Sequence, residues 1–267
     1  SATAIPALLI VLGAAILAFA SFRFVAMQPE AHTMTIAAGA VALAAGNLAW
    51  YATGQPSAAV PAWAAFLVLT IAGERLELSR FLPRSTPVRA TFVAIAVAIG
   101  ASAVLASDPG GARAFGAALL ALAAWLAVND LARRTVRDTG LPRFTAVCLL
   151  SGYVWLAIAG ATIVAAGLEP GTPAYDAALH ALFLGFVFAM VFGHAAIIFP
   201  AVLRVKVPYA PVFYLPLALL HASVALRLAG DATGSTDVLR SGGIANGVAL
   251  AAFIVTMVVA VAAGAPP

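Results

Sequence analysis

Four histidines, His32, His180, His194 and His221, are the residues of this sequence best suited to hold a metal ion or a haem. Imidazole is a common axial ligand of haem iron, and it also binds copper well. His180 and His194 stand fourteen residues apart in one apolar run, at 176–200. Fourteen residues of an α-helix advance by about 21 Å and return to within about 40° of the starting direction. The spacing therefore predicts two imidazoles on one helix face near opposite membrane surfaces, as two stacked haems would require.

The other two histidines complete two pairs under the topology derived below. His221 lies in the outer half of the run at 209–229, at a depth near that of His180, and His32 opens the run at 33–52, near the depth of His194. We therefore expect two haem b groups, ligated by His180 with His221 and by His194 with His32. A single haem, or a haem beside a copper ion, stays open. For His32, which stands at a helix end, a hydrogen bond between helices or a position at the membrane surface is the favoured alternative.

Polar groups that could support such a site stand near these histidines in the sequence. Asp176 is one helical turn before His180 and could accept its second ring proton, which is how ligand imidazoles are usually oriented. Arg227, Arg240 and Arg204 could pair with haem propionates. Two small residues of the same run, at positions where a flat macrocycle could approach the backbone, are Gly185 and Gly193.

The elements that must position these residues are transmembrane helices. Of the 267 residues, 64% are hydrophobic and 9% are charged, and the mean hydropathy is +1.06. A soluble globule could not cover so much apolar surface, whereas about 20 apolar residues in helical form span a bilayer. An all-α, polytopic transmembrane bundle of about nine helices is predicted as a single domain, 1–267. The runs are 4–22, 33–52, 58–78, 90–106, 112–131, 144–167, 176–200, 209–229 and 240–263.

Basic residues are distributed unevenly over the connections between these runs. If the first run crosses from outside to inside, the inner connections receive all 14 Lys and Arg residues except Arg113, Arg227 and Arg240. Positive charge gathers on the cytoplasmic side of membrane proteins. We therefore predict an outside amino terminus, a cytoplasmic carboxyl terminus and a location in the bacterial inner membrane. Because the basic charge then serves topology, the expected partner is the lipid bilayer and not nucleic acid.

The run at 176–200 carries a recognisable pattern, from His180-Ala181-Leu182 through Gly185 to Met190 and then Gly193-His194. This pattern resembles a characteristic helix of the NnrS-type proteins, polytopic bacterial membrane proteins associated with nitric oxide metabolism and described as containing haem and copper. The resemblance covers about one and a half helices. It implies a haem- or metal-bearing helix bundle.

Three classes of function follow from these observations. The leading hypothesis is a membrane haem protein for electron transfer or for redox chemistry linked to nitric oxide or quinol, alone or as a subunit of a larger respiratory complex. Whether the chain is itself an enzyme stays open. The first alternative is a proton-coupled transporter, in which the histidines and the carboxylates of Glu74, Glu77 and Asp130 form the proton path. The second is a membrane scaffold subunit without a cofactor.

Overall fold

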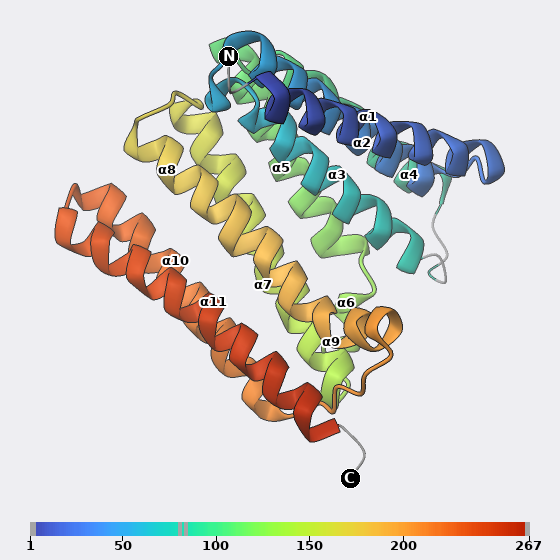
Figure 1. Ribbon diagram of the computed structural model, residues 1–267, viewed down its shortest axis with the longest axis vertical. Helices are drawn as coiled ribbons and strands as arrows, with labels where there is room; N and C mark the ends of the chain where they lie inside the picture. Colours follow the sequence, from blue (N-terminus) through green and yellow to red (C-terminus); the bar gives the residue numbers. More distant parts are fainter. Residues whose placement is uncertain (1–3, 80–81, 83–84, 265–267) are drawn as a thin grey trace. The chain divides into compact units, whose positions relative to one another are not determined.

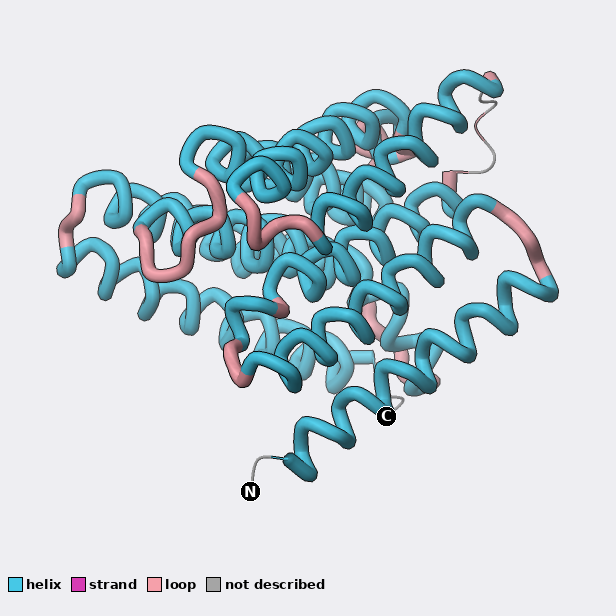
Figure 2. Tube along the Cα trace, turned by 90° about the horizontal axis from the view of Figure 1, so that it is seen from above, coloured by secondary structure: helices cyan, strands magenta, loops and turns pink. Residues whose placement is uncertain are grey.

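The computed structural model describes residues 4–79, 82 and 85–264, and all regular elements within these ranges are helical (Figure 2). The longer elements are α1 (Ala4–Met27), α2 (Ala31–Thr53), α3 (Val60–Leu78), α4 (Thr86–Val104), α5 (Pro109–Asn129), α7 (Gly140–Ala166), α9 (Ala189–Leu203), α10 (Tyr214–Thr233) and α11 (Thr236–Gly264). The shorter ones are η1 (Pro56–Ala58), α6 (Ala132–Thr135), α8 (Pro173–Leu179), η2 (His180–Phe188) and η3 (Pro211–Phe213). Each run predicted from the sequence coincides with one helical rod, and α8, η2 and α9 together form the rod predicted at 176–200.

Length and composition identify the chain as an integral membrane protein with about eight spans. Among the described residues, eight helical rods are long and apolar enough to cross a bilayer. The ninth rod, α3, is not among them, and it carries the three charged residues Glu74, Arg75 and Glu77 near its carboxyl end. The predicted all-α, polytopic fold class is thereby confirmed. The orientation of the chain ends stays a prediction.

Large apolar side chains cover the outside of several helices. Phe19 and Phe24 on α1 are 67% and 64% exposed, and Val258 on α11 is 61% exposed. Exposed apolar surface on this scale marks a membrane or a partner as its environment. Because the helices that carry it are long enough to span a bilayer, lipid is the natural solvent for these faces.

Short polar motifs define where the helices begin and end. At the start of α2, the Glu30 backbone N–H donates to Thr33 Oγ1 at 3.2 Å, and the Glu30 side chain accepts from the Thr33 backbone, which completes a capping box. Gly54 ends the same helix with φ of 69°, a left-handed conformation that glycine adopts without strain. At the start of α8, Thr172 accepts from the Tyr175 backbone N–H, and Pro173 fills the first helical position.

The described residues divide into two compact units. Unit 1 comprises Ser1–Trp125 and Ile163–Pro170, and unit 2 comprises Leu126–Thr162 and Gly171–Pro267. In unit 1, α2 packs against both α1 and α3 (Figure 1). Asn47 joins the three helices, since it accepts from Trp63 Nε1 at 2.8 Å and donates to the Ile10 carbonyl at 3.2 Å. Polar side chains commonly link helices in membranes in this way.

Unit 2 contains the histidines of the predicted outer site. Its helices α10 and α11 run side by side as an antiparallel hairpin (Figure 1). Their backbones approach closely at Gly230 and Gly242, where an added Cβ atom would lie 2.7 Å from the Leu239 backbone nitrogen and 2.9 Å from the Arg227 Cα atom respectively. Helices α8 and η2 pack against α10. The prediction of one domain over 1–267 stays a prediction.

Candidate functional site

His180 begins a nine-residue π-helix, η2, between the α-helical segments α8 and α9. In a π-helix the hydrogen bonds run from residue i to i+5, so each residue rotates by less than the about 100° of an α-helix. The predicted common face of His180 and His194 assumed α-helical rotation throughout, and that premise is wrong for residues 180–188. The spacing of fourteen residues therefore no longer implies that the two imidazoles lie on one side of the rod. Extended π-helical segments are rare and often accompany functional sites.

A charged cluster surrounds His180 at the amino-terminal end of this rod. The His180 Nδ1 atom lies 2.9 Å from the Asp176 carbonyl oxygen and 3.3 Å from Asp176 Oδ2. Arg227 on α10 donates from Nε to the same Oδ2 atom at 2.7 Å and from Nη1 to the Leu239 carbonyl at 3.1 Å. Asp176 and His180 are thus in contact through both the backbone carbonyl and the carboxylate of Asp176. The guanidinium predicted to meet a propionate instead holds a carboxylate of the chain itself.

Asp231 brings a second carboxyl group into this cluster. It follows Arg227 by one turn of α10, and its carboxyl group lies beside that of Asp176, close enough for their charges to interact. Its Oδ2 atom is buried and has no hydrogen-bond partner among the described residues. Two neighbouring carboxyl groups repel each other when both are ionised, and a shared proton removes this repulsion. We refer to Asp176, His180, Arg227 and Asp231 as the charged cluster.

His221, in contrast, is surrounded by neutral partners from α7. Its Nδ1 atom accepts from Trp155 Nε1 at 2.9 Å, and its Nε2 atom lies 2.9 Å from Ser151 Oγ. The indole N–H can only donate, so His221 Nδ1 carries no proton and the neutral ring must carry its proton on Nε2. The Ser151 hydroxyl then accepts a hydrogen bond from this N–H group and donates its own hydrogen to the Val147 carbonyl at 2.7 Å. We refer to Trp155, His221 and Ser151 as the neutral triad.

The glycines of the histidine rod receive side chains of α7. A Cβ atom added at Gly185 would overlap the base of the Trp155 indole, and one at Gly193 would lie 2.9 Å from Cys148 Cβ. The flat ring beside Gly185 is therefore an indole of the chain, and the expectation that these glycines receive a macrocycle is wrong for this structure. Small residues at this helix contact allow the backbones to approach closely, as is common in membranes.

Of the remaining predicted site residues, His194 and His32 have contacts outside the charged cluster. His194 Nδ1 lies 2.7 Å from the Met190 carbonyl of its own helix. His32 belongs to unit 1, where its Nε2 atom lies 3.9 Å from Glu77 Oε2. This contact between α2 and α3 agrees with the alternative given above for His32. Arg240 and Arg204 are exposed in unit 2.

The carboxylates considered for a proton path also differ in their surroundings. Glu74 is exposed, whereas Asp130 is 3% exposed. Tyr153 donates its hydroxyl proton to Asp130 Oδ2 at 2.9 Å, and the Ala132 backbone N–H donates to Oδ1 at 2.7 Å. Asp130 therefore joins the end of α5 to the middle of α7 and accepts from the first residue of α6.

The donor atoms of unit 2 fit a haem only in part. His180 has the arrangement usual for a ligand, because Asp176 holds its Nδ1 atom and orients the ring. His221 does not fit, because one ring nitrogen accepts from Trp155 and the other must carry the proton. Within the described ranges, no group of three or more His, Cys, Asp or Glu side chains is arranged to hold a metal ion.

Comparison with protein families gives one match over nearly the whole chain. The family described as Domain of unknown function (DUF8744) matches residues 1–262. The chain belongs to this family. No curated protein and no solved structure matched the chain. The family that matches is not that of the NnrS-type proteins, so the resemblance to the latter rests on residues 180–194 alone.

In this DUF8744 member, three residues that contact the histidines of unit 2 or their partners were not predicted from the sequence: Asp231, Trp155 and Ser151. Asp231 lies beyond the predicted run at 209–229, whereas α10 continues to Thr233. The spacing of Arg227 and Asp231, one helical turn apart, is the signal that could have found it. Trp155 and Ser151 lie one turn apart on α7, but no pattern in the sequence indicates that they face His221.

Proposed function

We propose that this protein is a proton-coupled membrane transporter whose charged cluster binds and releases the proton. The observation that carries the proposal is the charged cluster, in which Asp176 lies 3.3 Å from His180 and 2.7 Å from Arg227 with Asp231 beside it, on helices long and apolar enough to span the membrane. Ionisable groups in membrane spans are costly, and they commonly mark proton or substrate pathways.

The geometry supports distinct roles for the members of the cluster. Arg227 donates to Asp176 at 2.7 Å and so favours the ionised form of this carboxylate. A proton on Asp231 would then bridge the two carboxyl groups, and it would relieve their repulsion. His180, at 3.3 Å from Asp176 Oδ2, is the adjacent group that can accept a proton. Binding and release of one proton would change the net charge of the cluster, whose members lie on α8, η2 and α10.

Infrared difference spectroscopy tests the shared proton directly. We expect the carbonyl stretching band of a protonated carboxyl group in the wild-type protein and its loss in Asp231→Asn. Asp237→Asn is the matched control, because Asp237 is an exposed acid in the first turn of α11. If the wild-type protein lacks this band at every pH at which it stays folded, the shared proton is excluded.

Proton flux tests the transport function separately. In proteoliposomes under an imposed membrane potential, a trapped pH dye should report proton uptake that falls at least about tenfold in Asp231→Asn, because one carboxyl group of the pair is removed. Asp237→Asn should retain the wild-type rate. A wild-type rate equal to that of empty liposomes, with the carbonyl band intact, would leave a proton-binding site and exclude the transporter.

A haem protein is the second candidate, favoured by the orientation of His180 through Asp176 and by the resemblance to the NnrS-type helix. Bound haem b, or copper, would supply electron transfer or nitric oxide or quinol chemistry, alone or within a larger redox complex. Purified protein should then show a reduced b-type absorbance spectrum that is lost in His180→Ala. A colourless protein after growth with added haem precursor, with copper absent on analysis, would exclude this candidate.

We also infer that α3 crosses the membrane as a ninth span and that the protein lies in the bacterial inner membrane with the amino terminus outside, because the Lys and Arg residues then gather on one set of connections. Labelling of single introduced cysteines with an impermeant maleimide tests this orientation. A cysteine at Ser57 should react in intact cells, and one at Asp138 should react only after lysis.

A further inference from the structure

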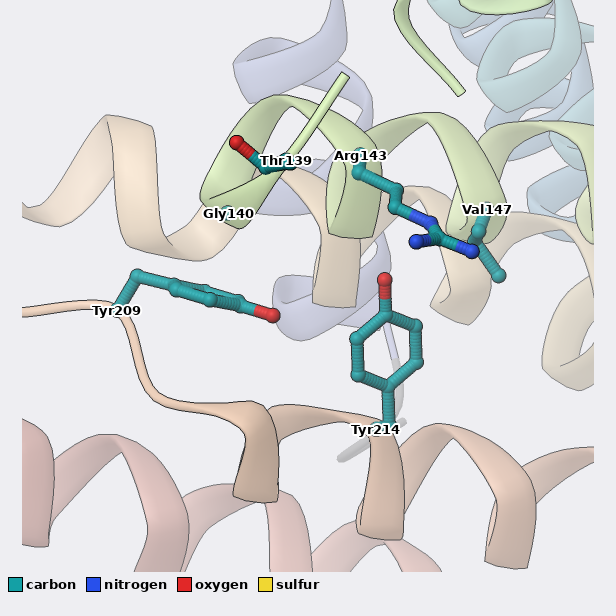
Figure 3. A pocket seen from close by; sticks show the side chains of 6 residues that line it. All are labelled: Thr139, Gly140, Arg143, Val147, Tyr209 and Tyr214. Atoms are coloured by element: carbon teal, nitrogen blue, oxygen red, sulfur yellow. The ribbon is translucent and has the colours of Figure 1, made fainter. Parts of the chain in front are cut away.

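A cavity of about 400 Å³ lies in unit 2 where α7 begins and where the segment after α9 returns to α10 (Figure 3). Its volume falls within the range of about 300–1,000 Å³ that is usual for small-ligand sites. The residues that line it are Thr139, Gly140, Arg143, Val147, Tyr209 and Tyr214. None of these described lining residues is acidic. Under the predicted topology, this cavity lies on the cytoplasmic side.

Three of the lining side chains, Arg143, Tyr209 and Tyr214, direct hydrogen-bond donors toward the cavity. Figure 3 shows the Arg143 guanidinium close to the Tyr214 hydroxyl, with the Tyr209 hydroxyl directed toward the same space. Arg143 is exposed at the cavity, and it forms no ion pair with any carboxylate of the described chain. An arginine without a carboxylate beside two phenol hydroxyls is suited to an anion, and the guanidinium matches the geometry of a phosphate.

An aromatic cluster holds the two tyrosines in place. Phe144, which is 2% exposed, packs with ring centroids 5.1 Å from Tyr214 and 6.4 Å from Tyr209. Phe213 packs against both Phe144 and Tyr209 at 5.7 Å. The hydroxyls therefore project from packed rings and lose little freedom when they bind a ligand.

We infer that this cavity binds the headgroup phosphate of an anionic phospholipid. The polar groups lie at the start of α7, and Val147, one turn further into the membrane span, supplies an apolar wall for the lipid's glycerol and acyl carbons. Basic pockets between helices on the cytoplasmic side commonly bind acidic lipid headgroups. This site is independent of the charged cluster and of any cofactor.

Binding of soluble short-chain lipids to the full chain in neutral detergent tests the inference. We expect dihexanoyl phosphatidylglycerol to raise the thermal unfolding temperature in a saturable manner, and dihexanoyl phosphatidylcholine to bind at least several-fold more weakly because its ammonium cancels the net charge. Arg143→Gln should weaken phosphatidylglycerol binding about tenfold, since a charge-assisted contact is lost. Tyr209→Phe with Tyr214→Phe should also weaken binding while the aromatic cluster remains packed.

Arg137→Gln is the matched control, because Arg137 is an exposed arginine in the same connection but does not line the cavity. It should bind phosphatidylglycerol as tightly as the wild type. Equal weakening in Arg137→Gln and Arg143→Gln would reveal general charge attraction and overturn the site. Inorganic phosphate that binds as tightly as the lipid would overturn the assignment to a lipid.

Discussion

The charged cluster and the neutral triad hold two histidines of the same unit in opposite ways. At His180, one ring nitrogen faces a carboxylate that is itself bonded to an arginine and lies beside a second carboxyl group. At His221, both ring nitrogens are bonded to neutral side chains of α7. The first site contains three further charged groups from two elements, whereas the second contains none among the described residues.

This contrast concerns what an added proton would meet at each ring. A protonated His221 would direct an N–H at the Trp155 N–H, and the two donors would repel. A protonated His180 would gain an ion pair with Asp176. Presence of a histidine in a membrane span is thus weak evidence for function by itself, and the partners of its two nitrogens decide its role.

The largest expected effect is the loss of Arg227. Arg227→Leu leaves two neighbouring carboxyl groups without a cation, and we expect it to lower the free energy of unfolding by about 3 kcal/mol. A double variant with Asp176→Asn should recover at least half of this loss. Chemical denaturation in detergent micelles measures both. Arg240→Leu, the same change at an exposed arginine of α11, should leave stability nearly unchanged. Equal losses at both arginines would contradict the ion pair.

A smaller loss of stability is expected for a substitution at Gly185, which contacts Trp155 of the neutral triad. Gly185→Ala forces the Trp155 indole to move, because the new Cβ atom would overlap its base. Overpacking of this kind typically costs about 1–3 kcal/mol. Gly247→Ala on α11 is the control, since no atom outside its local helix lies within 4 Å of the added Cβ. The same denaturation assay decides, and a neutral Gly185→Ala would show that α7 and η2 are not closely packed there.

The helical rods and the contact between Asp176 and His180 could be predicted from the sequence. The contacts between different helices could not. Apolar runs define membrane rods because lipid requires them, so each run has its helix. Asp176 and His180 are neighbours on one helix, where spacing alone decides the contact. The partners of Arg227 and His221 instead depend on how α10 packs against α8 and α7. Runs that are apolar on every side do not specify which faces meet.

The error at residues 180–194 has a different origin. The relative direction of the two side chains follows from their spacing only if every residue rotates as in an α-helix, but η2 is a π-helix. No local signal in His180–Phe188 indicates this geometry. Gly185 indicates a close approach to the rod, but the side chain that approaches it is the Trp155 indole and not the expected macrocycle.

The smallest effect is expected at Ser151, and it examines whether His221 is held in one form. Ser151→Ala removes the acceptor of the His221 Nε2–H group, and we expect a loss of about 1 kcal/mol in the free energy of unfolding. The tautomer should persist, because Trp155 still donates to Nδ1. Nitrogen-15 NMR of labelled histidines should therefore show a protonated Nε2 and a bare Nδ1 in both proteins. Trp155→Phe should release the ring to populate both tautomers, whereas a wild-type His221 with the proton on Nδ1 would contradict the neutral triad itself.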